Sequence, residues 1–256
     1  MEGNAPAERS GGPARGSALD ALMERASLAL ERTDYFEAER LAAEALERAH
    51  RAGEFEAMAR ILLPLQEARR QVRQLAVDSG VRVLVTDLGG LGGLRPGCYL
   101  VQPPLLGVDA RSIRETARGT GIPVLVLARE PLTRDGRWPV VAVGDEMALR
   151  AKVAPPRPLV RLEASPTKDD FGLAGAEPPP REWFEQAEEA LGDAAIERLD
   201  PEEPAPWLVD DLVRALGAHP THEKLHQRLA EECRRAAHGE IPDAGPHRPA
   251  GEDAFD

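Results

Sequence analysis

Residues 18–79 hold three consecutive stretches with the spacing of amphipathic helices, and this pattern constrains the fold more than any other part of the chain. The second stretch follows Asp34, an N-cap residue, and Glu37 stands three residues later, where it can complete a capping box. Gly53 follows as a stop signal. A narrow stripe of small and apolar residues recurs every three or four positions: Ala38, Leu41, Ala42, Ala45, Leu46 and Ala49. This stripe predicts a neighbouring helix that approaches closely.

The flanking stretches predict one helix before it and one after it. The first covers residues 18–32, and the third runs from about residue 54 to a Ser-Gly stop at 79–80. Pro64 lies inside the third stretch, where it removes one backbone hydrogen bond, so we expect a kink there. The residues that we expect to face inward are Leu19, Leu22, Ala26, Ala29, Phe55, Met58, Ala59, Leu62, Leu65, Val72 and Leu75.

The first two helices resemble one tetratricopeptide repeat. The string Asp34–Ala38, followed by Ala45, is similar to the opening of the second helix of that repeat. Thr33 replaces its turn glycine, and no second copy follows at the repeat period of about 34 residues. The resemblance therefore implies a helical hairpin, residues 18–52, capped by a third helix. It also implies a protein-binding module, with Tyr35 and Phe36 as candidate partner-binding residues.

The composition changes after residue 80. Apolar, β-branched runs at 81–85 and 124–128 predict buried strands, and 99–101 and 140–143 are weaker candidates. A short helix is predicted at 109–118. Residues 159–162 are a possible edge strand. This order predicts an α/β domain, residues 80–163, with a small parallel or mixed sheet.

Further helices are expected near the end of the sequence. Residues 164–180 read as a linker because they are rich in Pro and acidic residues. A helical segment should follow over 181–238, with helices at 181–191, 207–216 and 221–238. We expect a disordered leader at 1–17 and a disordered tail at 239–256.

Composition narrows the classes of function. The net charge is −12 and there is no basic stripe, which argues against nucleic acid as a partner. No stretch approaches the roughly 20 apolar residues of a membrane span. The leader has no apolar core typical of a signal peptide. Two cysteines form no disulfide framework. We therefore expect a cytosolic protein without a membrane anchor.

One string matches a metal-binding motif. His222, Glu223 and His226 form H-E-x-x-H, in which two histidines one helical turn apart bind zinc and the glutamate acts as general base. The motif is similar to that of zincin metallopeptidases. The alternative is structural, because His222, His226 and the apolar residues that follow them share one helical face that can border the core.

A second set of candidates lies at the predicted strand ends. Asp87, Arg129 and Glu130 follow strands, where the ligand crevice of a parallel sheet is found. We predict a non-enzymatic interaction or scaffold protein that binds another protein and carries no cofactor. The alternatives are a zinc-dependent hydrolase using the His222 motif and a small-ligand sensor using the strand ends.

Overall fold

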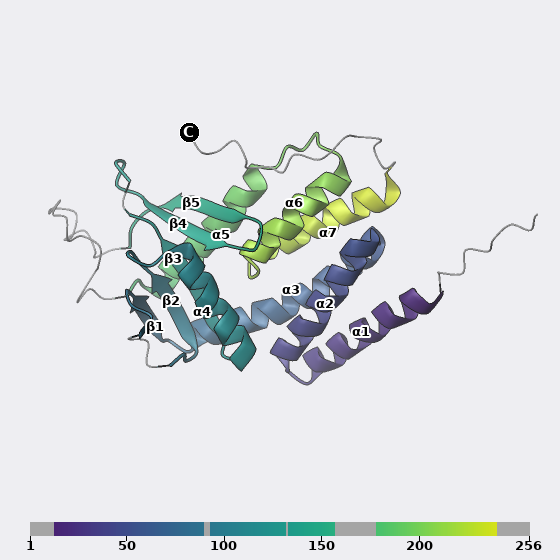
Figure 1. The fold of residues 1–256 in the computed structure, drawn as a ribbon, viewed down its shortest axis with the longest axis horizontal. Coiled ribbons are helices and arrows are strands. Elements are labelled where there is room, and N and C mark those ends of the chain that lie inside the picture. Colours follow the sequence, from purple (N-terminus) through teal and green to yellow (C-terminus); the bar gives the residue numbers. More distant parts are fainter. Residues whose placement is uncertain (1–12, 90–92, 132, 157–177, 240–256) are drawn as a thin grey trace, which may run out of the picture.

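The computed structural model describes residues 13–89, 93–131, 133–156 and 178–239. Within these ranges the chain forms a mixed five-stranded sheet with helices before, within and after it (Figure 1). The α/β class predicted from the sequence is confirmed. No helix in these ranges is long and apolar enough to cross a membrane.

Three antiparallel helices come first: α1 (Pro13–Glu31), α2 (Tyr35–Ala52) and α3 (Phe55–Asp78). The bounds of α2 agree with the sequence because both of its caps are local. The Asp34 carboxylate accepts a hydrogen bond from the backbone N–H of Glu37, and Gly53 adopts a left-handed φ of 67°. Helix α1 begins at Pro13 rather than at residue 18. Proline is favoured in the first turn, where its missing N–H costs nothing.

Helix α3 connects the two ends of the molecule. Its first half packs on α2, and its second half reaches beneath strands β2 and β3 (Figure 1). The helix continues through Pro64 to Asp78. The predicted inward face is buried at Met58, Leu62 and Leu65. Leu75 is 47% exposed, so its assignment to the core was wrong.

The sheet contains five strands: β1 (Arg82–Val85), β2 (Gly97–Val101), β3 (Val124–Arg129), β4 (Trp138–Val143) and β5 (Ala148–Val153). Their spatial order follows the sequence. Strands β1, β2 and β3 are parallel, whereas β4 and β5 are antiparallel to their neighbours. Strand β5 was missed because Arg150 and Lys152 interrupt its apolar pattern.

Helices cover both faces of the sheet. Helix α4 (Gly107–Thr120) packs on one face, where it buries Tyr99 and Val101. Cys98 and Leu100 point to the opposite face and join the main core. This alternation follows from the two-residue period of a strand. Helices α3 and α5 contact the strands from the second side.

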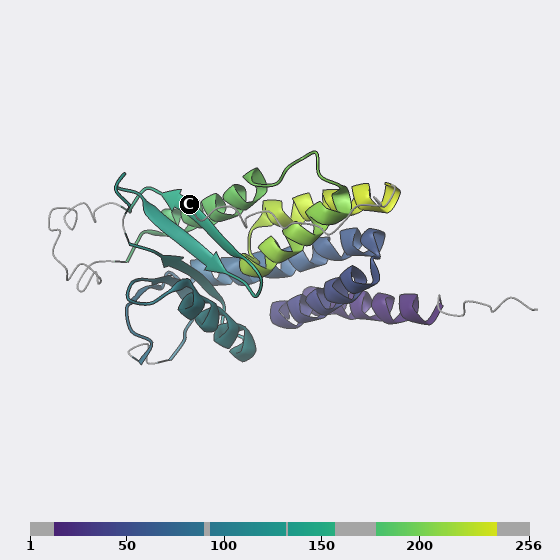
Figure 2. The same ribbon diagram turned by 45° about the horizontal axis from the view of Figure 1, so that its top comes forward.

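The last three helices are α5 (Arg181–Glu197), α6 (Ala205–Ala218) and α7 (Glu223–His238). Helix α5 packs on β4 and β5, where the Trp183 indole N–H donates to the carbonyl of Ala154. Helix α7 packs on α3 and α6, so α3 lies between α7 and the α1–α2 hairpin (Figure 2). The C-terminal helices therefore dock on the rest of the fold. The leader before residue 13, the edge strand at 159–162, most of the linker and the tail from 240 lie outside the described residues.

Candidate functional site

The two histidines of the H-E-x-x-H string lie at the first turn of α7. Both are buried, with exposures of 2% for His222 and 1% for His226. His222 is the N-cap of α7: its Nδ1 accepts a hydrogen bond from the backbone N–H of Leu225 at 3.2 Å. The predicted apolar face of this helix is buried, and the histidines border it. The sequence had placed His222 inside the helix rather than at its cap.

The two imidazoles face different partners. His226 Nδ1 lies 2.9 Å from the carbonyl oxygen of His222, so Nδ1 carries the proton and donates. His226 Nε2 then accepts from the Arg69 guanidinium at 3.2 Å. Burial and the Arg69 charge lower the pKa of His226 to about 3. A guanidinium at Nε2 occupies the lone pair that a metal would need. His226 is thus committed to α3 and does not converge with His222 on one ion.

Arg69 belongs to a buried charge network between α2, α3 and α4. Its Nε donates to Glu39 Oε1 at 3.0 Å, and Arg118 of α4 donates to the same oxygen at 2.9 Å. Glu39 and Arg69 are only 6% and 8% exposed. Burial lowers the pKa of Arg69, and the neighbouring carboxylate opposes that shift. The network connects the N-terminal helices to both α4 and α7.

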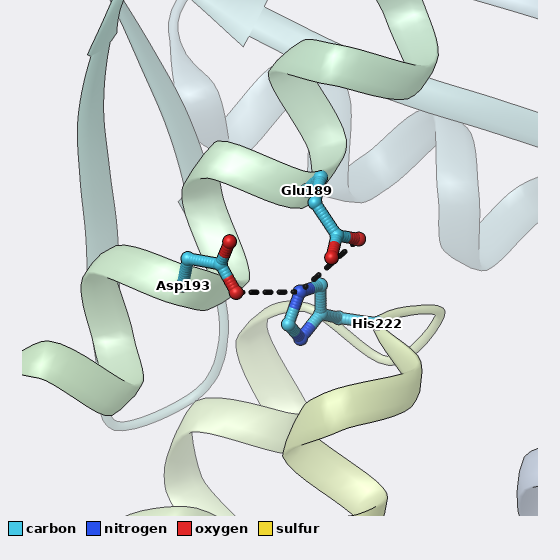
Figure 3. Close-up of side chains that lie close together, drawn as sticks. All are labelled: Glu189, Asp193 and His222. Atoms are coloured by element: carbon cyan, nitrogen blue, oxygen red, sulfur yellow. Dashed lines mark ion pairs between the residues drawn. The ribbon is translucent and has the colours of Figure 1, made fainter.

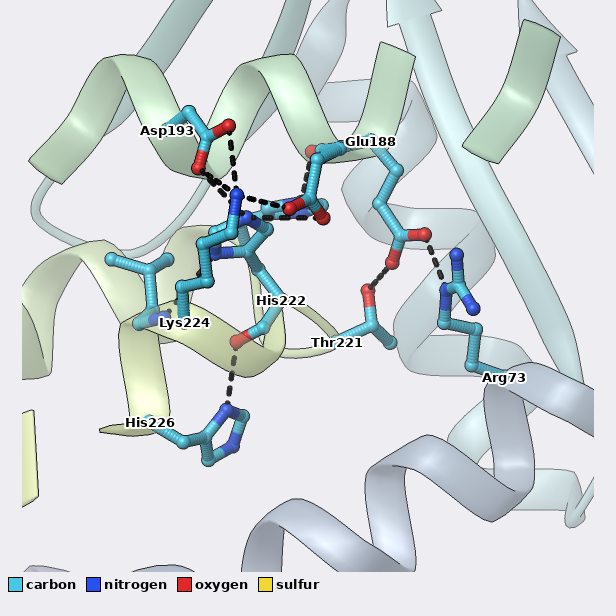
Figure 4. A network of polar contacts seen from close by, with 10 residues as sticks. Arg73, Glu188, Asp193, Thr221, His222, Lys224 and His226 are labelled. Atoms are coloured by element: carbon cyan, nitrogen blue, oxygen red, sulfur yellow. Dashed lines mark hydrogen bonds and ion pairs between the residues drawn. The ribbon is translucent and has the colours of Figure 1, made fainter. Parts of the chain in front are cut away.

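A second network links α3, α5 and the turn before α7 (Figure 4). The buried Glu188 carboxylate accepts from Arg73 and from the Thr221 hydroxyl, and its backbone carbonyl accepts from His219 Nε2 at 2.9 Å. Burial raises the pKa of Glu188, and burial lowers that of His219 to about 3. The rings of His219 and His222 stack with centroids 5.7 Å apart.

His222 also faces two carboxylates of α5. Its Nε2 lies 3.5 Å from Glu189 Oε2 and 3.7 Å from Asp193 Oδ1 (Figure 3). Neither distance is a hydrogen bond, and this buried nitrogen has no hydrogen-bond partner. Lys224 lies on the same carboxylates, with Nζ 2.9 Å from Asp193 Oδ1. We call Glu189, Asp193 and His222 the acid–imidazole cluster. The sequence does not predict this cluster, because its acids lie on α5 and its imidazole lies at the cap of α7. The detectable signal was two acidic residues one turn apart on α5.

The strand-end candidates lie at the same edge of the sheet but contact different groups. Asp87 is exposed and accepts from the backbone N–H of Gly89. Glu130 pairs with Arg150, with 3.0 Å between Oε1 and Nη2. Arg129 is buried, donates to Gln102 Oε1 at 3.0 Å, and stacks over the Trp138 ring.

A further feature is a hollow of about 600 Å³ at the end of the α1–α2 hairpin. Leu19 and Ala49 are buried in it, and Arg48, Arg51 and Glu54 surround it. The predicted partner-binding residues Tyr35 and Phe36 begin α2, at its opposite end, and both are half-buried. We call this hollow, which does not include Tyr35 or Phe36, the hairpin hollow. Its lining residues are Ala18, Leu19, Arg48, Ala49, Arg51, Ala52 and Glu54.

Comparison with protein-family models, with curated proteins and with solved structures gives no match.

Proposed function

We infer that this chain is a non-enzymatic interaction protein whose N-terminal helices bind a segment of another protein. The observation that carries this proposal is the hairpin hollow. It combines an apolar floor with arginines at its rim, and it is built from the helices that resemble a tetratricopeptide repeat.

The composition of the hollow supports a peptide as the bound group. Leu19 and Ala49 form the buried floor of the hollow, and the exposed Ala52 at its edge offers a small apolar contact. Arg48 and Arg51 pair with glutamates one turn earlier on α2, but both arginines are exposed at the rim. Such exposed pairs are weak, so an acidic group on a partner can compete for the guanidinium groups. These features favour a segment with small apolar and acidic side chains.

The test fills the hollow without altering the core. Ala52 is exposed at its edge, and Ala52→Trp should abolish recovery of a partner from cells of the source organism. Glu31→Trp, at the opposite end of α1, adds the same side chain outside the hollow and should leave recovery unchanged. Circular dichroism confirms that both variants are folded. Recovery that survives Ala52→Trp would contradict the proposal.

The other end of the hairpin needs its own variant. Tyr35 and Phe36 remain candidates, and changing both to Ala asks whether the partner extends along α2. If this change releases the partner from a folded protein while Ala52→Trp does not, the interaction surface lies at the start of α2 and outside the hollow.

One observation favours the small-ligand alternative. The Gln102 side chain is fully buried at the end of β2, and its Nε2 has no hydrogen-bond partner. An unpaired buried amide is costly, and a bound acceptor would remove that cost. A thermal-shift screen with small carboxylic acids and nucleotides tests this, because a bound ligand raises the melting temperature. The hydrolase alternative has no comparable support, since His222 and His226 direct Nε2 to different partners.

A further inference from the structure

The distances in the acid–imidazole cluster match shared coordination better than hydrogen bonding. A hydrogen bond would bring the His222 nitrogen and a carboxylate oxygen to about 2.7–3.2 Å. The observed separations are 3.5 Å to Glu189 and 3.7 Å to Asp193. Two ligands on one tetrahedral zinc ion, each at about 2.0–2.1 Å, lie about 3.4 Å apart. One ligand atom from each of the three residues lies within 4.8 Å of the others.

The imidazole is held rigidly in this position. Its side chain is 1% exposed, and Nε2 points between the two carboxylates without a hydrogen-bond partner (Figure 3). Gly192 lies under the ring, and a Cβ there would approach the imidazole to 2.1 Å. The chain therefore places a buried nitrogen ligand directly on the helix that carries the acids. A buried polar atom in this setting is costly unless something binds it.

We propose that Glu189, Asp193 and His222 bind a divalent transition-metal ion of the zinc type, which replaces the Lys224 ammonium on the two carboxylates. Carboxylate oxygen and imidazole nitrogen are both ligands of zinc. The two acids are 49% and 38% exposed, so their side chains can close on the ion and leave further positions to water.

Two existing interactions are exchanged when the ion binds. Lys224 leaves the carboxylates; its side chain is 52% exposed and can move into water as an ammonium ion. The proton on His222 Nε2 is lost, and one is taken up at Nδ1, so the ring stays neutral. Nδ1 then no longer accepts the N–H of Leu225. Binding therefore costs the α7 cap bond and competes with a built-in cation, and both costs weaken the affinity.

The competition with Lys224 can be tested because removing the lysine should strengthen zinc binding, whereas removing the acids should weaken it. Zinc is titrated calorimetrically into the full chain and its variants. Lys224→Met removes the competing cation and should tighten binding by about twofold to fivefold, the strength of an exposed ion pair. The double variant Glu189→Gln/Asp193→Asn replaces the two half-exposed acids with neutral amides and should abolish zinc binding at the cluster.

The imidazole is tested by a variant that keeps the cap. His222→Asn supplies another good N-cap side chain but removes the ring nitrogen, so it should weaken binding by at least about tenfold. His238→Asn, at the exposed end of α7, should leave binding unchanged and controls for zinc on surface histidines. The proposal is overturned if wild-type protein takes up no zinc, if the acid pair binds as wild type does, or if Lys224→Met binds no tighter.

Discussion

The imidazole of His222 lies directly on Gly192, so closely that a Cβ at position 192 would stand 2.1 Å from its Cγ. The contact lets the α7 cap sit against α5 without an intervening side chain. It places Nε2 between Glu189 and Asp193. Gly192 lowers the stability of α5 as an isolated helix, but its missing side chain allows the cap of α7 to approach α5 closely.

Gly192→Ala should destabilise the protein by about 1–3 kcal/mol, because the added methyl group overlaps the buried ring. Gly217 is the matched control: it lies in α6, is exposed, and has nothing within 4 Å of an added Cβ. Gly217→Ala should stabilise by about 0.5–1 kcal/mol through helix propensity. Urea unfolding measures both changes. Stabilisation by both substitutions would show that the ring does not pack on Gly192.

Local signals explain which elements the sequence predicted well. The bounds of α2 follow from Asp34 and Gly53, which act on neighbouring backbone groups. Helix α3 continues through Pro64 to Asp78, as the apolar stripe on both sides of the proline predicts. The end of α5 was placed six residues too early, at Leu191 instead of Glu197, since the stripe there passes through Gly192 and Asp193.

Long-range pairing explains what the sequence did not predict. Nothing local brings Glu189 of α5 to His222, or Arg69 of α3 to His226. The H-E-x-x-H spacing is compatible with a shared metal, but the Arg69 contact at His226 depends on how α3 packs against α7. The Gln102 contact of Arg129 is not predicted for the same reason, because it depends on the pairing of β2 with β3.

The buried pair of Arg69 and Glu39 should couple strongly. Arg69→Met leaves the Glu39 carboxylate in the core with Arg118 as its remaining partner, at a cost of about 3 kcal/mol. Glu39→Leu combined with Arg69→Met should cost less than the sum of the two single changes, because no buried charge is then left unpaired. Arg118 also loses Glu39, but its side chain is 51% exposed and remains in contact with water. Denaturant unfolding of the four proteins gives the coupling. Additive effects would contradict this description of the network.

Stability should fall in acid because His219 and His226 are buried as neutral rings. Their folded pKa values are about 3, below the value of about 6.5 in an unfolded chain. Between about pH 6.5 and 3 the unfolded chain binds protons that the folded chain does not. Each ring then lowers the free energy of unfolding by about 1.4 kcal/mol per pH unit. Above this range their contribution is complete.

The raised pKa of Glu188 makes the folded state bind a proton in acid more readily than the unfolded chain, which opposes the effect of the histidines on stability. The variant His219→Gln therefore measures the contribution of one ring by difference. Glutamine can still donate to the Glu188 carbonyl that His219 contacts. In chelator-treated protein, the slope of unfolding free energy against pH should decrease by about 1.4 kcal/mol per unit. An unchanged slope would mean that His219 titrates in the folded state as it does in the unfolded chain.

Both cysteine thiols should be unreactive in the folded protein. Burial raises the pKa of Cys98 to about 11 and that of Cys233 to about 12. The reactive thiolate is therefore scarce, and the sulfur atoms are inaccessible. A maleimide probe followed by mass spectrometry should label neither residue until denaturant is added. Rapid labelling of Cys233 in native buffer would show that α7 separates readily from its neighbours.

Photocrosslinking from the hairpin hollow tests the proposed function most directly. A benzophenone amino acid at Ala52, at the edge of the hollow, should give one discrete protein adduct in cells of the source organism. The same group at Leu63, which is 72% exposed on α3 outside the hollow, should not give that adduct. An adduct from Ala52 alone is the predicted result. No protein adduct from Ala52, or the same adduct from both positions, would contradict the assignment of the hollow as the interaction site.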